Sequence, residues 1–205
     1  MTIDEIAECL LNGGVALLPT DTVYGLAASP LHPTAVARIF SLKARPQTHN
    51  LPIMVASAND MAALGVDMNG YVQKILASDY VPGDITMVMG FQDTPSRRNR
   101  NKSLSWLEGR EEVAIRIPNH PQMLAILEKT GPLLVTSANR HGNPTTPLTV
   151  EEVLADLTDA PDMAIDGGIV ENVPSTIINC RSTPPVIERS GRILYKELFN
   201  LLNNE

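Results

Sequence analysis

Two short polar segments, each directly after an apolar run, contain residue types suited to ligand binding. Residues 20–25 (TDTVYG) follow the apolar run 15–19 and present two hydroxyls, a carboxylate and a phenol. Residues 136–139 (TSAN) follow a second apolar run and offer hydroxyl and amide groups that can hydrogen-bond a phosphate or a nucleotide. Ligands of open α/β sheets usually bind in loops at strand ends, so both segments are candidates for one site.

A third candidate is a pair of cations. Lys43 and Arg45 are separated by one residue, so in an extended segment both side chains project to the same side. Two neighbouring cations suit a polyphosphate. Each of these signals is weak alone, because a lysine and an arginine at this spacing also end ordinary helices, and serine and asparagine after a strand commonly form a turn.

The signatures of several other catalytic sites are missing from the sequence. It contains no GxxxxGK[ST] phosphate loop, no GxGxxG fingerprint, no GxSxG elbow and no HExxH metal helix. The four histidines lie in separate loops without ligand spacing, and we expect surface positions for them. Cys9 and Cys180 are too far apart in sequence for a CxxC redox pair or a zinc motif, and we expect both to be buried.

Composition and charge indicate one folded domain with an anionic ligand. A chain of 205 residues with 43% hydrophobic and 19% charged residues has the size of one domain and is too apolar for intrinsic disorder. No apolar run reaches the roughly 20 residues of a membrane span, so we expect no membrane contact and a cytoplasmic location. The net charge is −7, yet basic residues outnumber acidic ones between residues 97 and 116. This distribution favours an anionic small molecule or a local RNA contact over a nucleic-acid coat.

The pattern of apolar residues predicts an α/β protein. Thr2 and Glu5 have capping-box spacing before a helical repeat of apolar residues that runs to Leu11. Further helices are predicted at 34–42, 71–77, 121–129 and 150–157, and Ser57 with Asp60 has the spacing to cap another. Strands are predicted at 15–19, 53–56, 85–89, 113–117, 133–136, 175–179 and 186–189, and the longest loop at 92–112. Helices and strands do not alternate strictly near the C-terminus, so we expect a mixed sheet in a single domain over residues 1–205.

Six motifs in a fixed order are more specific than any one of them. They are PTDTVYGL at 19–26, KARP at 43–46, AIRIPNHP at 114–121, TSANRHG at 136–142, STII at 175–178 and ERSG at 188–191. In order and spacing the chain resembles the YrdC-like family of threonylcarbamoyl-AMP synthases over roughly residues 5–195. The resemblance implies an α/β fold with a twisted mixed parallel/antiparallel sheet, flanking helices and a large concave cavity. It also implies a nucleotidyltransferase that joins L-threonine, bicarbonate and ATP into threonylcarbamoyl-adenylate and pyrophosphate, for threonylcarbamoyladenosine modification of tRNA.

The same resemblance implies roles for individual residues. Those expected to bind ATP are Lys43, Arg45, Ser137, Asn139 and Arg189, with the first two as catalytic cations on the phosphates. Those expected to bind threonine are Thr20, Arg116 and Ser175. Mg²⁺ is expected on the ATP phosphates and not in a protein metal site. Attack of a carbamate oxygen on the α-phosphate needs cations and positioning, and no protein nucleophile. The implied partners are the proteins that transfer the threonylcarbamoyl group to tRNA.

Departures from the family pattern leave alternatives open. Proline is common in the family where this chain has Asn50, Asp84 and Thr136. A carboxylate at Asp84 would oppose ATP binding if it faced the site. The run THNLP at 48–52 also resembles a paralogue group of the family. One alternative function is an RNA-binding module for tRNA or double-stranded RNA without synthase activity. Another is formation of carbamoyl-adenylate from carbamoyl phosphate, a reaction of much longer proteins.

Overall fold

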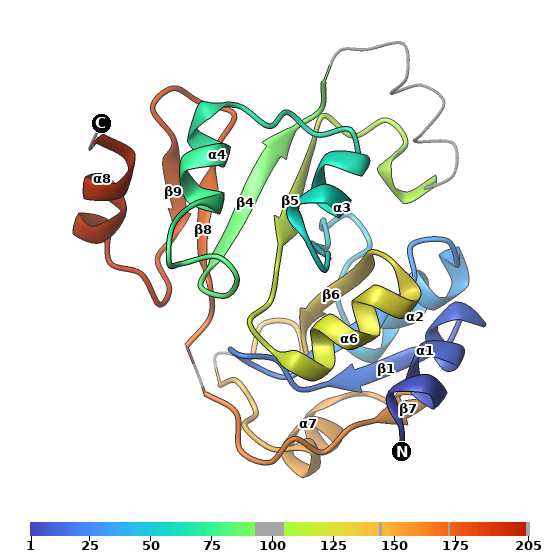
Figure 1. Cartoon of the computed structure of the whole chain (residues 1–205). Coiled ribbons are helices and arrows are strands. Elements are labelled where there is room, and N and C mark those ends of the chain that lie inside the picture. Colours follow the sequence, from blue (N-terminus) through green and yellow to red (C-terminus); the bar gives the residue numbers. More distant parts are fainter. Residues whose placement is uncertain (93–104, 144, 172, 204–205) are drawn as a thin grey trace.

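One mixed sheet organises the chain. A computed structural model describes residues 1–92, 105–143, 145–171 and 173–203, so residues 93–104 of the predicted loop 92–112 lie outside the described part. The strands follow the order β7-β1-β2-β6-β3-β5-β4-β8-β9 (Figure 1). Their bounds are β1 Val15–Leu18, β2 Gly25–Ala28, β3 Ile53–Met54, β4 Ile85–Gly90, β5 Glu112–Arg116, β6 Leu133–Ser137, β7 Met163–Ala164, β8 Thr176–Asn179 and β9 Val186–Arg189.

Both parallel and antiparallel pairs occur in this sheet. The pairs β1–β7, β3–β5 and β4–β8 are parallel. The pairs β1–β2, β2–β6, β3–β6, β4–β5 and β8–β9 are antiparallel. The expected mixed α/β sheet with flanking helices is therefore confirmed.

Helices cover the two faces of the sheet unequally. Their bounds are α1 Ile3–Leu11, α2 Pro33–Leu42, α3 Ala58–Ala63, α4 Gly70–Leu76, α6 Pro121–Thr130, α7 Val150–Asp156 and α8 Tyr195–Asn203, with a short 3₁₀ helix, η2, at Ser105–Leu107. Apolar residues of α1 and α6 form a small core with β1, β2, β3 and β6. Apolar residues of α2, α3, α4, α7 and α8 belong to a larger core.

Alternation along two central strands leaves a concave surface. In β4, Met87 and Met89 enter the larger core, whereas Thr86 and Val88 point to the opposite face. β5 alternates in the same way. Apolar residues of α1 and α6 join only β1, β2, β3 and β6 in the small core, so the side chains of β4 and β5 on this face line a cavity instead of a core.

Local side-chain chemistry explains where several helices begin. The predicted capping box of α1 is present, since Thr2 and Glu5 accept each other's backbone N–H groups. Asn69 caps α4 by accepting from two backbone N–H groups, and Thr149 caps α7. Interior helices and strands lie within a few residues of the predicted bounds because these caps and turns are encoded locally.

Besides the short η2, three of the described elements were not predicted. β2 has the sequence GLAA and lacks the β-branched residues that typify strands. It forms because β1 and β6 pair with it on both sides. β7 has only two residues, and α8 follows the last predicted strand. Cys180 is buried as expected, whereas Cys9 is partly exposed, which corrects that expectation.

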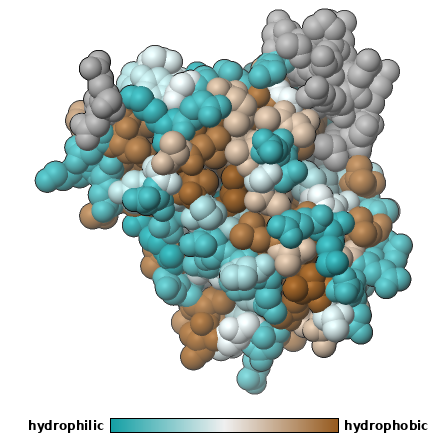
Figure 2. Space-filling view, viewed as in Figure 1, coloured by the Kyte–Doolittle hydropathy of each residue, from teal (hydrophilic) through white to brown (hydrophobic). Residues whose placement is uncertain are grey.

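On the face shown in Figure 2, hydrophobic patches lie between polar residues. The hydrophobic side chains lie mainly in the two cores, as expected for a globular protein. Within the described ranges, no helix is long and apolar enough to cross a membrane.

Candidate functional site

A cavity of about 410 Å³ lies on the sheet face opposite the larger core. This volume is in the range of small-molecule sites. Six of the eight predicted site residues line it: Thr20, Arg45, Arg116, Ser137, Ser175 and Arg189. Residues far apart in sequence therefore meet in one place because β2, β6, β3, β5, β4, β8 and β9 are neighbours in the sheet.

Arg116 is a buried cation with fixed geometry. At the end of β5 it is 4% exposed and forms an ion pair with Asp21, 2.8 Å from Nη2 to Oδ2. Its Nε donates to the Gly83 carbonyl (2.8 Å) and its Nη1 to Thr22 Oγ1 (3.0 Å). Burial lowers the pKa of Arg116, and the Asp21 carboxylate opposes that shift. Since a guanidinium has five N–H donors, two remain beyond these three bonds to the described residues.

The turn after β1 is organised by Thr20. Its buried hydroxyl donates to the Val23 carbonyl (2.6 Å) and accepts from the backbone N–H groups of Thr22 and Val23. Thr20 thus shapes the wall of the cavity, and its single hydroxyl proton is used inside the turn. Tyr24 does not line the cavity, because its hydroxyl donates to the Gly168 carbonyl and accepts from Gly167 N–H.

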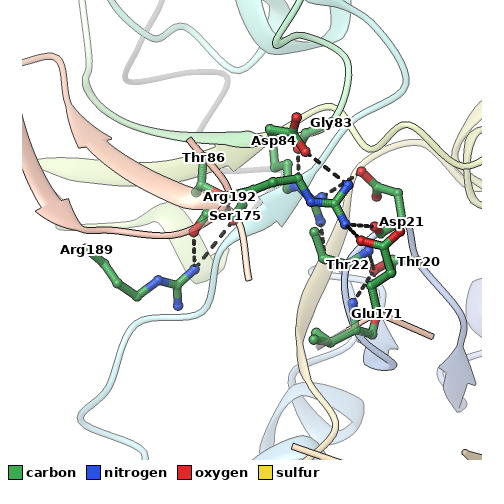
Figure 3. A network of polar contacts seen from close by, with 12 residues as sticks. Thr20, Asp21, Thr22, Gly83, Asp84, Thr86, Glu171, Ser175, Arg189 and Arg192 are labelled. Carbon is green, nitrogen blue, oxygen red and sulfur yellow. Dashed lines mark hydrogen bonds and ion pairs between the residues drawn. The ribbon is translucent and has the colours of Figure 1, made fainter. Parts of the chain in front are cut away.

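The side of the cavity near β8 and β9 carries hydroxyls and the guanidinium of Arg189. Thr86 and Ser175 share a hydrogen bond of 2.7 Å between their hydroxyl oxygens. Arg189 Nη2 donates to the Ser175 carbonyl at 2.8 Å, so its guanidinium points toward Ser175 (Figure 3). Thr86 was not predicted as a site residue. Its signal is a polar residue at alternate spacing inside the apolar strand ITMVMG.

At the opposite side, near β6, Arg45 borders the cavity. Its Nη1 donates to Thr136 Oγ1 (3.3 Å) and its Nη2 to the Asn50 carbonyl (3.2 Å). Its buried Nε has no hydrogen-bond partner among the described residues. A half-buried guanidinium with donors to spare suits an anionic ligand. Asn50 lines the same wall, and its side chain accepts from Arg110.

Lys43 does not share the wall with Arg45. The segment is not extended, since Lys43 caps α2 and Ala44 has a φ of 48°. Lys43 is 2% exposed, and its Nζ donates to the backbone carbonyls of Ser137 and Asn139. The expected parallel projection of the two cations is therefore wrong, because the helix end turns Lys43 inward. Burial, and secondarily the charge of Arg45, lower the pKa of Lys43 to about 7.

Asn139 also lies outside the residues that line the cavity. Its side-chain oxygen accepts from Ser137 Oγ (2.7 Å), and its amide donates to the Asn143 carbonyl (3.2 Å). Lys43 and Asn139 thus fix the loop that presents Ser137. The structure brings both residues to this loop without placing either on the cavity surface.

Asp84 does not face the cavity as an unpaired charge. It forms an ion pair with Arg192 (3.3 Å) and is absent from the cavity lining, so its carboxylate does not face a ligand there directly. Two other carboxylates, Glu112 and Glu188, do line the cavity. Glu112 pairs with Arg181, and Glu188 accepts from the Asn179 amide.

The arrangement suits a ligand with at least two anionic groups. Arg45 lies near β6, Arg116 at the end of β5 and Arg189 in β9, with hydroxyls of Thr86, Ser137 and Ser175 between them. Charge-assisted hydrogen bonds from guanidinium groups in a concave site are strong and directional. Within the described residues, no group of three or more His, Cys, Asp or Glu side chains is arranged to hold a metal ion.

Comparison with known proteins relates this chain to one family. Residues 8–191 match the Sua5/YciO/YrdC family model, whose description reads "Telomere recombination". The chain is 32% identical over 202 residues to "Threonylcarbamoyl-AMP synthase" of Bacillus subtilis, covering 96% of this chain and 55% of that protein. It is 29% identical over 191 residues to "Uncharacterized protein YciO" of Escherichia coli, covering 92% and 88%. The chain thus spans about half the length of the synthase and most of the length of YciO.

Solved structures show the same fold. The crystal structure of Pyrococcus abyssi Sua5 complexed with L-threonine matches with a TM-score of 0.84 and 31% identity, over 98% of this chain and 57% of that chain. The crystal structure of E. coli YciO matches with a TM-score of 0.78 and 29% identity, over 96% and 92%. The expected twisted mixed sheet and its cavity agree with this fold, and the chain belongs to the Sua5/YciO/YrdC family.

Proposed function

We propose that this chain is an L-threonylcarbamoyladenylate synthase, which forms threonylcarbamoyl-AMP and pyrophosphate from L-threonine, bicarbonate and ATP. The observation that carries the proposal is the cavity with three guanidiniums, in a chain whose fold matches Sua5 solved with L-threonine. The likeness to a named threonylcarbamoyl-AMP synthase over nearly the whole chain supports the same reaction.

Threonine is proposed to bind beside Arg116. Two N–H groups of its guanidinium are not used by the described residues and suit a carboxylate. The hydroxyls of Ser175 and Thr86 lie on the same cavity wall and can hydrogen-bond the substrate. Thr20 supports this subsite indirectly, because its hydroxyl proton holds the turn that carries Asp21 and Thr22.

ATP is proposed to bind with its phosphates toward Arg45 and Ser137. Arg189 is proposed to contact the nucleotide as well. The threonine amine and bicarbonate form the carbamate N-carboxythreonine, with loss of water. A carbamate oxygen then attacks the α-phosphorus, and the bond from that phosphorus to the pyrophosphate oxygen breaks. Arg45 would offset negative charge that moves onto the leaving pyrophosphate. Mg²⁺ would enter on the phosphates, since it commonly keeps several waters and is held largely by substrate phosphates.

Lys43 and Asn139 are proposed to act through the Ser137 loop. Lys43 Nζ binds the carbonyls of residues 137 and 139, and Asn139 accepts from the Ser137 hydroxyl. Both are positioning residues in this proposal, not direct phosphate ligands. The product would pass to the proteins that modify tRNA, and we propose a cytoplasmic location to match.

The direct test is pyrophosphate release by the purified protein with ATP, Mg²⁺ and bicarbonate, with and without L-threonine. We expect release only when threonine and bicarbonate are both present. Arg45→Ala should lower kcat/KM for ATP by at least 100-fold, because it removes a cation from the phosphate side of the cavity.

Arg38→Ala is the matched control. It removes a guanidinium that pairs with Asp162 and does not line the cavity, so its turnover should equal that of the unaltered protein. ATP binding without threonine-dependent release would contradict the synthase proposal and favour another acceptor. Salt-sensitive RNA binding without ATP binding would favour the RNA-binding alternative.

A further inference from the structure

Two arginines from different parts of the chain, Arg116 and Arg192, both contact the turn at Asp21 and the turn at residues 83–84. Arg116 contacts the Asp21 carboxylate and the Gly83 carbonyl. Arg192, in the connection between β9 and α8, donates from Nη2 to the Asp21 carbonyl (3.1 Å) and pairs through Nη1 with Asp84 (3.3 Å). One arginine thus binds the side chain of Asp21 and the other its backbone. Figure 3 shows Arg192 between Asp84 and Asp21, with Glu171 on the same guanidinium.

The segment that carries Arg192 is itself tied to the cavity wall. Arg192 N donates to the Pro174 carbonyl (3.1 Å). The backbone N–H groups of Gly191 and Ile193 both donate to the hydroxyl of Thr176 (3.1 Å each). Residues 191–193 therefore lie against residues 174–176, which include the cavity residues Pro174 and Ser175.

Arg192 itself does not line the cavity, so it has no direct route to a ligand there. Its side chain and that of Asp84 are each 28% exposed, whereas the Arg116–Asp21 pair is 4% and 10% exposed. A partly exposed ion pair adds little stability by itself. Its larger effect is on geometry. The pair restrains the two turns that present the Asp21 carboxylate and the Gly83 carbonyl to the Arg116 guanidinium.

We propose that Arg192, together with Asp84, is a positioning residue that holds the Asp21 and Gly83 turns around Arg116 and thereby sets the affinity of the cavity for the substrate carboxylate. This inference rests on the proposed function, since it assigns the carboxylate of threonine to Arg116. Without Arg192, Asp84 loses its cation, and the Asp21 carbonyl loses a donor. The turns then sample more conformations, and Arg116 spends less time in the binding geometry.

The test compares steady-state kinetics of the unaltered protein with those of Arg192→Met, Arg192→Lys and Asp84→Asn. Arg192→Met should raise KM for L-threonine about 10-fold and leave kcat within about 2-fold, because the interaction lost is equal in the ground and transition states. Arg192→Lys, which keeps the charge near Asp84, should recover part of that loss. The effects of Arg192→Met and Asp84→Asn should be less than additive, since both remove one interaction.

Arg38→Met is the control for a lost guanidinium. Arg38 also pairs with a carboxylate and donates to a backbone carbonyl, at 37% exposure, but outside the cavity. It should leave KM for threonine unchanged. Hydrogen exchange of the Val23 and Gly83 amides gives a readout independent of turnover, and it should be faster in Arg192→Met and unchanged in Arg38→Met.

The outcomes separate the two proposals. Threonine-dependent release with an unchanged KM in Arg192→Met would overturn the positioning role and leave the synthase proposal standing. A fall in kcat with unchanged KM would also overturn it. No release from the unaltered protein would overturn the synthase proposal first, and unchanged hydrogen exchange in Arg192→Met would then reject the restraint on the turns as well.

Discussion

Two buried basic residues of this protein have different kinds of partner. Arg116 has a carboxylate partner, Asp21, and stays a fixed positive charge in the cavity wall. Lys43 has two backbone carbonyls as hydrogen-bond acceptors. A neutral amine has two N–H groups, which suffice for both carbonyls, whereas burial of the ammonium form costs free energy. This difference explains why the pKa of Lys43 falls to about 7.

The first residue-scale prediction concerns pH. Because the pKa of Lys43 is lowered from 10.5 to about 7, the unfolded chain binds more protons than the folded chain between these values. The contribution of Lys43 to the free energy of unfolding should therefore rise as pH increases from about 7 to about 10.5, by at most about 1.4 kcal/mol per pH unit. In Lys43→Met this contribution should be absent. Urea unfolding at pH 7, 8, 9 and 10 measures it.

Lys129→Met is the matched control for this pH series. Lys129 is exposed and pairs with Asp4, which raises its pKa above the ordinary 10.5, so it stays almost fully protonated in both states from pH 7 to 9. Its variant should keep the slope of the unaltered protein. Equal slopes in Lys43→Met and the unaltered protein would show that Lys43 remains charged when buried.

At the scale of elements, the segment after β9 closes one wall of the cavity. Gly191 lies so near residues 174–175 that a Cβ atom there would be 2.3 Å from the Pro174 carbonyl oxygen and 2.6 Å from that of Ser175. Only a residue without a side chain permits this approach. The backbone N–H of Gly191 can then reach the Thr176 hydroxyl at 3.1 Å.

Gly191→Ala should therefore separate the two segments. We expect the free energy of unfolding to fall by about 1–3 kcal/mol, as in other overpacked sites. We also expect KM for threonine to rise, because Ser175 moves with its backbone. Urea unfolding and the pyrophosphate assay measure the two effects.

Gly70→Ala is the corresponding control. Its Cβ would meet no atom within 4 Å, and the residue is the first of α4. The stability of this variant should match that of the unaltered protein. A neutral Gly191→Ala would mean that the backbone shifts without cost and that the close approach is not needed.

At the scale of the whole molecule, a single sheet runs through the described chain. Strands from the first third, β1 and β2, are joined to β6, and the C-terminal strands β8 and β9 are joined to β4. No boundary divides the larger core, which contains residues from Val15 to Leu198. Such a molecule should unfold as one unit.

We therefore predict one calorimetric transition for residues 1–205. The heat-capacity change should be about 2.5–3 kcal/mol/K, at about 12–15 cal/mol/K per residue. The calorimetric and van't Hoff enthalpies should agree. Two resolved transitions, or a van't Hoff enthalpy well below the calorimetric value, would show that the chain contains two independently folding parts.

Local sequence was sufficient for much of the fold. The capping box at Thr2 and Glu5, the apolar period of α1 and the apolar strands β1, β4 and β6 depend on residues close together in the chain. Polar segments after apolar strands and the cation pair pointed to Thr20, Ser137 and Arg45, and the family resemblance added Arg116, Ser175 and Arg189; all six line the cavity. β2 could not be predicted, since pairing with β1 and β6 and not its own propensity makes it a strand.

The roles of the charged residues depended on tertiary structure. Lys43 and Arg45 are both basic and only one residue apart. The end of α2 nevertheless turns Lys43 toward backbone carbonyls and leaves Arg45 on the cavity wall. Asp84 has its partner at Arg192, 108 positions later in the sequence (192 − 84), at 3.3 Å. Sequence determines which groups carry charge. Only the fold determines which charges are buried, paired or open to a ligand, because Coulomb energy and desolvation depend on distances and burial that no local pattern encodes.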